Sequence, residues 1–427
     1  MFWFRRDLRV SDNLALTEAT GCNSCFYYHS TFLSIGLKEP LPPSEYRRTF
    51  ENQSLTSLEE NLRSHGKYLF RSSQDPIQEI PMICSSDGIS TVFCSRGFSW
   101  HDRWQENALK RRLEDIGVRL VVIDSERFPW KPPVYLNPRS IFTDYKGKME
   151  ALLSHGIPKL ASNGTFLKSE LFLPSNDGCE MISSKRGFPS GGEYQSWNRI
   201  HEFVRKDGGI EHYLDTRNGM LGYSYSSVFS PFLAMGCCTA AQIYEAVKEH
   251  EMLVGASKST YWIIFELLWR SYFRWISEIH GSRLFVSAGY NERGVRQFAR
   301  DKEKLRDWIR GKTSEPLVNA CMRELGHTGF MGNRARQIAA SYLIHDLGVD
   351  WTWGARYFEH MLIDYDACSN YGNWCYLAGV GSDPRPLRRF NPSLQQEKYD
   401  PDHIYVNHWL GSSAIELNDE YFEMITM

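Results

Sequence analysis

The sequence predicts two domains of different class, an α/β domain with a parallel sheet over residues 1–130 and an all-α domain over residues 191–410. In the first domain, short apolar runs alternate with amphipathic stretches, which is the rhythm of a parallel α/β fold. In the second domain, apolar residues recur at helical spacing. Turn-forming residues with little periodicity separate the two, so residues 131–190 are expected to form a long connector.

The first domain is expected to contain five short strands and two helices. Each predicted strand is a brief apolar run rich in aromatic or β-branched residues. These runs lie at 2–4, 25–28, 68–70, 91–93 and 118–123. Amphipathic spacing predicts helices at 57–63 and 104–116. Strands that alternate with helices in this way pair in parallel.

The second domain is expected to be helical throughout. Its predicted helices cover 193–206, 231–248, 259–280, 300–310, 317–325, 334–347 and 354–362. The second of them begins with Ser230 and Pro231, and proline suits the first turn of a helix. Residues 411–427 hold four acidic and no basic residues, and we expect them to form a surface tail.

Composition narrows the class of protein. With 427 residues, and roughly 150 residues per domain, the chain has room for up to three domains with a sizeable core. A hydrophobic content of 42% and a charged content of 23% exclude a disordered chain. The formal net charge of -2 excludes a polycation, so any nucleic-acid surface must be a local patch. The sequence shows no membrane span and no signal-peptide core, so we expect a soluble intracellular protein, in a compartment that the sequence does not specify.

The ten cysteines are scattered along the chain, as is usual for proteins of a reducing compartment. Cys22 and Cys25 form one C-x-x-C pair. No second pair and no histidine accompanies it at the spacing of a zinc site. We therefore predict no metal site.

Residues 259–276 are too apolar for a surface helix, yet they contain Glu266, Arg270 and Arg274. A buried charge needs a partner, and Glu266 and Arg270 lie four residues apart, so they can pair on one helix. Trp269 lies on the same face as Glu266. Two interpretations are open: a structural ion pair in a helical core, or a pocket wall in which a carboxylate and an indole face a planar ligand.

Residues 362–376 are expected to form a loop, because they bring two carboxylates, two amides and several aromatic groups into a short stretch. Loops of this composition commonly bind ligands. Asp364 and Asp366 could act as general acid and base, although no nucleophile is found nearby. The alternative is an aspartate-rich turn whose carboxylates cap backbone groups.

Three further features could bind anions. Asn333, Arg334 and Arg336 gather at a predicted helix start, where arginine is unfavourable unless it meets an anion or a carboxylate. The hydroxyls of residues 225–230 could seat a phosphate, although serines before a helix are usually caps. Residues 269–312 hold eleven Lys or Arg against five Asp or Glu, which suits either solvent or a nucleic-acid backbone.

Six segments of the chain resemble the photolyase/cryptochrome flavoproteins, and the similarity is greatest to the cryptochrome DASH branch. The segments are 2–13, 216–222, 225–231, 265–270, 328–334 and 366–385. The resemblance is dense over about 190–410 and thin over 20–190. It implies an N-terminal antenna domain and a C-terminal FAD-binding catalytic domain, in a protein that we expect to be a monomer.

The resemblance implies a U-shaped FAD in the helical domain. The residues at the family's FAD positions are Tyr213, Ser226, Ser227, Phe229, Ser230, Glu266, Arg270, Asn333, Arg336, Asp364, Asp366 and Asn370. Hydroxyls would meet the phosphates and the ribityl chain, and Asp364 and Asp366 would meet Arg336 and polar atoms of the cofactor. Asn370 would face flavin N5, where an amide suits a reduced or neutral-radical flavin. The plant photoreceptors carry an acid there, so asparagine favours repair chemistry.

The implied activity is repair of cyclobutane pyrimidine dimers by an electron from light-excited, fully reduced FAD. The lesion must leave the base stack, which is easiest in single-stranded DNA, and such DNA is the expected main partner. The implied substrate-binding residues are Glu266, Trp269, Asn333, Gln337 and Tyr376. The implied catalytic residues are Glu266, Trp269, Asn333, Asn370, Trp374 and Trp351.

Two of these positions distinguish between relatives. Tyr376 stands where photolyases for double-stranded DNA commonly have tryptophan, which is a DASH trait. Asn333 and Gln337 stand where photolyases for the other main pyrimidine photoproduct need a histidine pair, which disfavours that class. A second hypothesis is a blue-light photoreceptor that signals or binds nucleic acid with little or no repair. A third is an FAD-free scaffold, which would be colourless.

Two departures from the family bear on electron transfer and on the antenna. The family's three-tryptophan chain for flavin photoreduction corresponds to Trp374, Trp351 and, at its outer end, Phe298, which is far harder to oxidise. Either the last step is lost, or a neighbour such as Trp353 or a tyrosine replaces it. Near residues 96–97, the acid that DASH proteins use for folate is missing, so a 5,10-methenyltetrahydrofolate antenna is left open.

Overall fold

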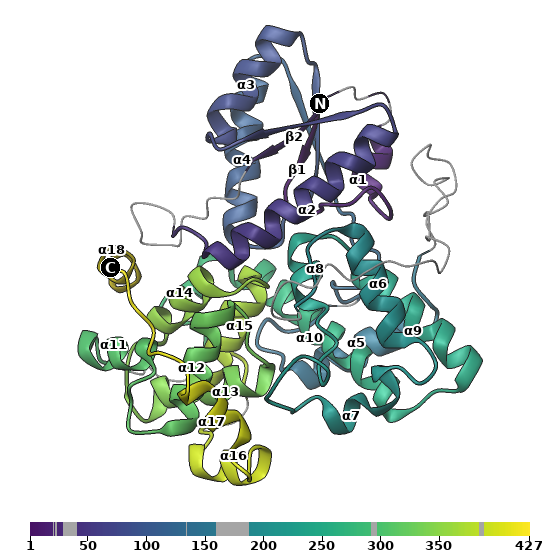
Figure 1. The fold of residues 1–427 in the computed structure, drawn as a ribbon. Helices are drawn as coiled ribbons and strands as arrows, with labels where there is room; N and C mark the ends of the chain where they lie inside the picture. The colour runs from purple at the N-terminus through teal and green to yellow at the C-terminus, as the bar shows by residue number, and fades with distance from the viewer. Residues whose placement is uncertain are drawn as a thin grey trace.

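The computed structural model describes residues 1–19, 21, 24–28, 41–133, 135–158, 188–291, 297–383 and 388–427. The pair Cys22 and Cys25 is therefore only half within the described residues. Figure 1 shows the α/β domain stacked on a larger helical domain, in which the helices of residues 193–280 lie to one side and those of residues 302–410 to the other.

Within the described residues, the α/β domain is built on one sheet of five parallel strands. The strands are β1 (Phe2–Phe4), β2 (Ser24–Tyr28), β3 (Tyr68–Ser72), β4 (Thr91–Ser95) and β5 (Arg119–Ile123). Their spatial order is β3-β2-β1-β4-β5, and Phe2 of β1 aligns with Cys25 on one side and Phe93 on the other. The chain thus builds outward from β1 in both directions, as in doubly wound α/β folds. The predicted fold class is confirmed.

The helices of this domain cover the two faces of the sheet (Figure 1). They are α1 (Leu14–Glu18), α2 (Glu45–Ser64), α3 (Pro76–Asp87) and α4 (Trp100–Glu114). Each begins after a residue whose side chain accepts a backbone N–H, and these caps are Asn13, Ser44, Asp75 and Ser99. The sequence did not predict α3, where Pro81 interrupts the helical pattern.

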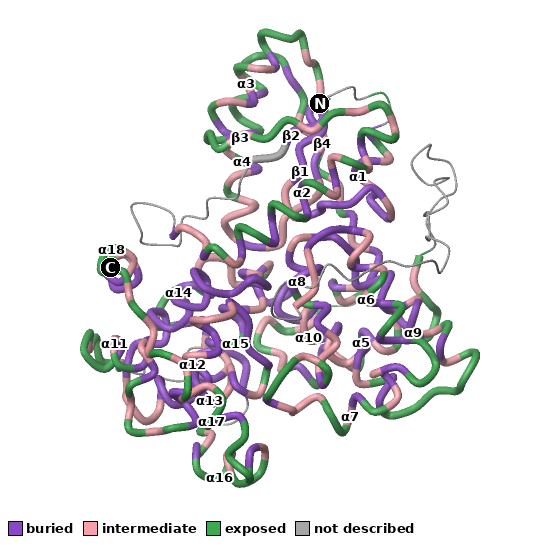
Figure 2. The backbone as a smooth tube through the Cα atoms, viewed as in Figure 1, coloured by how far each residue is buried: buried purple, intermediate pink, exposed green. Residues whose placement is uncertain are grey.

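Alternation along β1 divides the apolar core in two. Phe2 and Phe4 point to one face and join a cluster that continues into the helical domain. Trp3 points to the other face and packs with Ile80 and Leu109 in a separate cluster. Figure 2 shows the buried backbone running from the central strands into the inner helices of the second domain. The α/β domain and the helical domain therefore share one core.

The second domain is helical, as predicted. Its longer helices are α6 (Glu193–Val204), α9 (Ala240–Val254), α10 (Lys258–His280), α11 (Lys302–Arg310), α12 (Pro316–Thr328), α13 (Asn333–His345), α14 (Trp351–Met361) and α15 (Ala367–Ala378). Shorter elements are η1 (Gly209–His212), α7 (Tyr213–Thr216), α8 (Ser230–Met235), η2 (Gly281–Phe285), α16 (Pro392–Tyr399), α17 (Ile404–Leu410) and α18 (Asp419–Thr426).

The helix predicted over 231–248 is two helices, because the chain breaks at Gly236. This glycine has a φ of 72°, and a Cβ there would lie 2.0 Å from the backbone oxygen of Arg6. The break lets the N-terminal segment enter the helical domain: Nη1 of Arg9 donates to the oxygen of Gly236 at 3.0 Å. In the same segment, the backbone N–H of Val10 donates to the Glu193 carboxylate at 2.9 Å.

The interval 131–190, predicted as a connector without regular structure, contains the helix α5 (Phe142–Leu153). Phe142, Tyr145 and Met149 are buried, and the Tyr145 hydroxyl donates to the oxygen of Trp130 at 2.8 Å. The sequence did not predict this helix, because turn residues on either side hide its one-faced pattern, and the connector itself stays a prediction. Residues 159–187 of the predicted connector lie outside the described residues.

The predicted acidic tail also contains a packed helix, α18. Its Phe422 and Ile425 are fully buried, and Nη1 of Arg356 donates to the oxygen of Ile425 at 3.1 Å. Glu423 forms an ion pair with Lys302 at 2.6 Å. The acidic residues are exposed, so the segment does lie at the surface, but the charge pattern did not predict that part of it is a packed helix. None of the helices in the described parts of the chain is long and apolar enough to cross a membrane.

Candidate functional site

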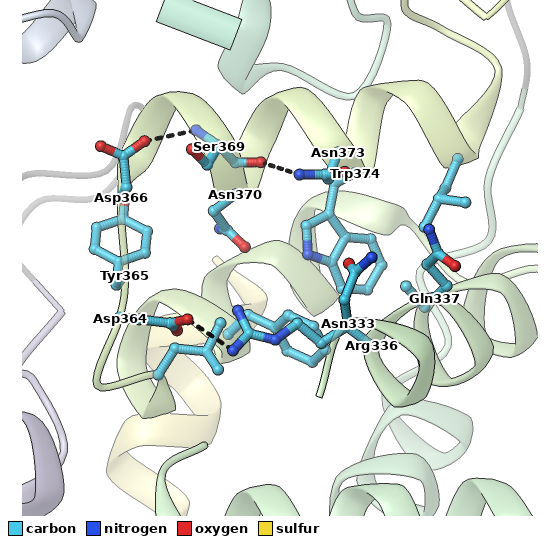
Figure 3. Close-up of a pocket in the computed structure, with 14 residues that line it drawn as sticks. Asn333, Arg336, Gln337, Asp364, Tyr365, Asp366, Ser369, Asn370, Asn373 and Trp374 are labelled. Atoms are coloured by element: carbon cyan, nitrogen blue, oxygen red, sulfur yellow. Dashed lines mark hydrogen bonds and ion pairs between the residues drawn. The ribbon is translucent and has the colours of Figure 1, made fainter. Parts of the chain in front are cut away.

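A cavity with an empty volume of about 540 Å³ opens between α13 and α15, and it brings together much of the predicted site (Figure 3). The lining residues are Asn333, Arg336, Gln337, Ala340, Phe358, Leu362, Asp364, Tyr365, Asp366, Ser369, Asn370, Asn373, Trp374 and Leu377. Seven of them were predicted as site residues: Asn333, Arg336, Gln337, Asp364, Asp366, Asn370 and Trp374.

The segment predicted as a loop over 362–376 is mostly the helix α15, which was an error. Asp366 is its N-cap, and its carboxylate accepts the backbone N–H of Ser369 at 2.8 Å. The cap interpretation of Asp366 is therefore confirmed. Asn370 and Trp374, four residues apart, project from this helix toward α13 (Figure 3). Polar residues face the cavity and interrupt the apolar pattern that Cys368, Tyr371 and Cys375 form on the buried side of the helix.

Arg336 and Asp364 form the ion pair at the floor of the cavity. Nη2 of Arg336 lies 2.8 Å from Oδ2 of Asp364, and Nε donates to the backbone oxygen of Met331 at 2.7 Å. The Asp364 side chain is 2% exposed. Its other oxygen, Oδ1, is buried and has no hydrogen-bond partner within the described residues. A buried acceptor left open is costly unless a ligand donates to it.

The Asn370 amide is fixed by one hydrogen bond. Its Nδ2 donates to the backbone oxygen of Ala355 on α14 at 3.0 Å, and its side-chain oxygen is directed into the cavity (Figure 3). An acceptor therefore faces the cavity at this position. Together with Oδ1 of Asp364, it gives the cavity two acceptors, which fits a planar ring that carries N–H donors, such as a flavin.

Arginines surround Asp366 from the other side of the site. Burial alone would raise the pKa of Asp366, but the charges of Arg270, Arg274 and Arg6 outweigh it and lower the pKa. Arg270 also lies 3.4 Å from Glu126, and Nη2 of Arg270 donates to the oxygen of Leu233 at 3.2 Å. Asp366 is therefore an anion held in a positive environment.

The predicted ion pair between Glu266 and Arg270 is not formed. Glu266 instead accepts the Tyr213 hydroxyl at 2.7 Å and lies 3.6 Å from Arg217. Burial raises the pKa of Glu266, although the hydrogen bond from Tyr213 and the charge of Arg217 oppose it. Glu266 thus contacts residues far away in the sequence, and not Arg270, the partner that the i, i+4 spacing predicted. Glu266 is a carboxyl group that holds its proton more readily than an exposed one.

Trp269 and Tyr376 link the α10 side of the site to α15. Their ring centroids lie 5.6 Å apart at 78°. One face of the Trp269 indole stacks on Phe142 at 3.7 Å and 10°. Nη2 of Arg388 donates to the Tyr376 hydroxyl at 2.7 Å. Phe142 and Arg388 were missed from the sequence, since Phe142 lay in the supposed connector and Arg388 in a stretch without periodicity.

The predicted phosphate seat does not line the cavity. Ser226 accepts the backbone N–H of Val228 at 3.2 Å, in a turn where Val228 has a φ of 52°. Arg199 binds the backbone oxygens of Ser226 and Ser227 at 2.7 and 2.9 Å. Phe229 is buried in the core, whereas Ser230 is exposed. Tyr213 and these four residues lie outside the cavity lining, so their role toward a cofactor stays a prediction.

The tryptophans predicted for electron transfer are buried. Trp351 is fully buried and Trp374 is 2% exposed. The Trp374 ring contacts Phe358 at 5.1 Å and Trp308 at 6.4 Å between centroids. Nε1 of Trp351 donates to the oxygen of Ser287 at 3.0 Å. Trp353 is buried as well, whereas Phe298 is half-buried at the edge of the core.

The region where the folate-binding acid is missing joins the two domains. Arg96 contacts both carboxylate oxygens of Glu278 on α10, at 2.8 and 2.7 Å, and Arg103 pairs with the same carboxylate. A Cβ at Gly97 would lie 2.1 Å from Cβ of Asp102. None of these contacts indicates whether folate binds here, so the antenna stays a prediction. In the described residues, no cluster of three or more His, Cys, Asp or Glu is placed to hold a metal ion.

A doubly wound α/β domain on a helical domain, with a cavity into which Asp364 and Asn370 present acceptors, fits a two-domain flavoprotein. A family model for the FAD-binding domain of DNA photolyase matches residues 262–424, and one for DNA photolyase matches residues 1–160. A cryptochrome DASH of Idiomarina loihiensis is 34% identical over 96% of this chain and 92% of its own length. The chain belongs to the photolyase/cryptochrome family.

Solved structures show the same relationship. A cryptochrome from Synechocystis sp. has a TM-score of 0.81 and 32% identity, with 96% of this chain and 88% of that chain covered. A bacterial class III photolyase from Agrobacterium tumefaciens has a TM-score of 0.77 and 28% identity, with 96% and 86% covered. The predicted FAD-binding domain is confirmed by these matches, and FAD is its cofactor.

Proposed function

We propose that this chain is a light-driven, FAD-dependent lyase that repairs cyclobutane pyrimidine dimers, chiefly in single-stranded DNA. The observation that carries the proposal is the amide at Asn370. Its Nδ2 is bound to the oxygen of Ala355, so an acceptor faces the cavity. A reduced flavin carries a proton on N5 that such an oxygen can accept, whereas a carboxylate there favours another protonation state.

Residues of this chain would hold FAD by complementary charge and hydrogen bonding. Oδ1 of Asp364 would accept a ring N–H, and Arg336, already bound to Oδ2, holds that side chain in its orientation. Asn333 lines the same cavity. The hydroxyls of Ser226 and Ser227 would meet the phosphates. When bound, FAD supplies the light-driven electron.

The lesion would bind between α10 and the mouth of the cavity. Trp269 and Tyr376 present an aromatic edge and face suited to stacked pyrimidines. When protonated, Glu266 would donate to a pyrimidine carbonyl, and its raised pKa extends the pH range in which it carries that proton. Asn333 and Gln337 would hydrogen-bond the remaining base edges. Tyrosine at 376 supports a preference for single strands, where less energy is needed to expose the lesion.

This assignment places catalysis in residues 191–410, the antenna domain in 1–130 and the connector in 131–190. The test illuminates reduced, FAD-loaded protein with dimer-containing oligonucleotides, single- and double-stranded. We expect dimer loss, faster on single strands. No dimer loss on either substrate would exclude repair.

A matched pair of variants separates cavity chemistry from simple loss of an amide. Asn370→Asp places an acid at the cavity and should lower repair while FAD is kept. Asn407→Asp makes the same change at an exposed position of α17 (Ile404–Leu410), outside the cavity lining. It should leave repair unchanged. Equal effects of both variants would remove the special role of Asn370.

The second candidate function is a blue-light photoreceptor with little or no repair. The observation in its favour is Phe142, which occupies one face of Trp269 and so closes part of the lesion site. A photoreceptor would photoreduce its FAD in the same light without any dimer loss. The repair assay therefore distinguishes the two functions directly.

A further inference from the structure

Tyr371 is a buried tyrosine on α15 that joins an indole to a carboxylate. Its hydroxyl donates to Oε2 of Glu359 on α14 at 2.8 Å, and both side chains are 2% exposed. Its ring contacts Trp351, with 6.3 Å between centroids and 74° between planes. A proton acceptor within hydrogen-bond reach is what a phenol needs in order to lose an electron and a proton together.

We infer that Tyr371 is the terminal electron donor for flavin photoreduction in this chain, and that Glu359 accepts its proton. The inference rests on FAD bound in the cavity and not on DNA repair. It answers the absence of an indole at Phe298, where the family's outer donor would stand. Phenylalanine has neither an easily oxidised ring nor a proton to release.

The step balances in electrons and protons. With FAD bound, the oxidant would be the photoexcited, oxidised flavin, and the electron would come from Trp374 and then from Trp351, the route that the family resemblance implies. Trp351 is left with one positive charge and an unpaired electron. One electron moves from Tyr371 to Trp351, and the phenolic proton moves to Oε2 of Glu359. The products are neutral Trp351, a neutral tyrosyl radical and a protonated Glu359.

The groups around Trp351 and Glu359 favour electron transfer from Tyr371 to Trp351. Nε1 of Trp351 donates to a backbone oxygen, that of Ser287, at 3.0 Å, and a peptide carbonyl is too weak a base to take the indole proton. Oxidised Trp351 thus stays a cation and a strong oxidant. Arg47 donates to the backbone oxygen of Glu359 at 2.6 Å. This contact fixes the position of Glu359 beside the Tyr371 hydroxyl.

A second buried tyrosine, Tyr357, lacks a proton acceptor and allows a comparison with Tyr371. Tyr357 is 2% exposed, and its ring lies 5.9 Å from Trp308, which in turn lies 6.4 Å from Trp374. Its hydroxyl has no hydrogen-bond partner within the described residues. Oxidation of Tyr357 would leave a proton with nowhere to go. The branch through Trp308 therefore ends without a donor, and Tyr357 is a natural control.

The test uses the FAD-loaded full chain without DNA, so its outcome does not depend on repair. Flash illumination of oxidised protein is followed by electron paramagnetic resonance, with ring-deuterated tyrosine to identify the radical. We expect a tyrosyl signal in the unmodified chain and in Tyr357→Phe, and its loss in Tyr371→Phe, which keeps the ring. A tyrosyl signal that survives Tyr371→Phe, or none in the unmodified chain, overturns the inference.

Two further variants test the acceptor and the route. Glu359→Gln keeps the shape but cannot take the proton, so tyrosyl formation should slow roughly tenfold, as a barrier higher by about 1.4 kcal/mol would produce. Unchanged tyrosyl formation would show that Glu359 does not take the proton.

Phe298→Trp restores an outer indole and should reduce the tyrosyl yield without changing Tyr371 or Glu359. An undiminished yield would show that Trp351 does not pass the charge outward. Bound FAD is measured in each variant in the dark.

Discussion

The two sides of the site differ in whether their polar and aromatic side chains already have partners within the protein. On the α13 and α15 side, Oδ1 of Asp364 has no partner in the described residues and the Asn370 oxygen faces the cavity. On the α10 side, Glu266 is already bound to Tyr213, and Trp269 is stacked on Phe142. The first side is preorganised for a cofactor, whereas under the proposed function the second side would exchange its protein contacts for a transient substrate.

Removal of Arg336 should give the largest effect, because it breaks the preorganised side. Arg336→Met leaves the Asp364 carboxylate buried and unpaired, which costs about 3–5 kcal/mol. We expect FAD to be lost and the free energy of unfolding to fall, as measured by absorbance and denaturant titration. Arg389→Met, which breaks an exposed pair with Asp346, is the control and should change neither. Full FAD content in Arg336→Met would show that the cofactor side does not depend on the ion pair between Arg336 and Asp364.

Replacement of Trp269 tests the side that must rearrange. Trp269→Ala should weaken binding of a dimer-containing single strand by about 1–3 kcal/mol, the usual worth of one stacked base. FAD content should stay the same, because Trp269 is not part of the cavity lining. Gel-shift titrations with dimer-containing DNA and with matched lesion-free DNA give the part of the binding free energy that is specific to the lesion. Loss of FAD in this variant would mean that the two sides are one site.

A buried acid behind the cavity gives a pH test of the preorganised side. Glu324 is 3% exposed, and burial raises its pKa to about 8, although the hydrogen bond from Tyr405 and the charge of Arg336 oppose this. The folded chain keeps a proton there that the unfolded chain releases above pH about 4.3. Stability from this group is therefore present at low pH and is lost as pH rises through about 8.

The slope is at most about 1.4 kcal/mol per pH unit over that window. Glu324→Gln should flatten the slope in urea titrations at several pH values. Glu303→Gln, at an exposed position of α11, controls for the loss of a carboxylate elsewhere. A slope that Glu324→Gln leaves unchanged would show that Glu324 is not the group responsible.

The smallest effect is expected at Glu266. Its raised pKa lets it donate a hydrogen bond to a pyrimidine, and this bond is lost as pH rises through that pKa. Affinity for the lesion should therefore fall with rising pH by about 1 kcal/mol, the net worth of one hydrogen bond. Glu266→Gln, which donates at every pH, should remove the dependence. The same dependence in Glu266→Gln would assign it to another group.

The sequence predicted the strands and the long helices because their apolar residues follow a single period. It failed for α15, where Asp366, Ser369, Asn370 and Asn373 face a cavity instead of a core. A helix that lines a binding site has polar residues where the pattern demands apolar ones. The same feature that marked the segment as functional thus disguised its structure.

Site residues were predicted better than their partners. The motifs placed Asn333, Arg336 and Asn370 around one cavity, as the structure shows. The partner of Glu266 was wrong, because spacing along one helix cannot reveal that Tyr213 lies within reach. Phe142 was missed for the same reason. Contacts between distant segments depend on packing, which one sequence without homologues does not report.

The N-terminal segment has a consequence for how the chain is made. Arg9, Val10 and Asp12 bind Gly236, Glu193 and Thr239, residues 183 to 227 positions later. At a synthesis rate of about 5–20 residues per second, the first dozen residues wait roughly 10–45 s for these partners. During that time the apolar strand β1 has no helical domain to cover it. Expression of this protein should therefore depend on chaperones more than its final stability suggests.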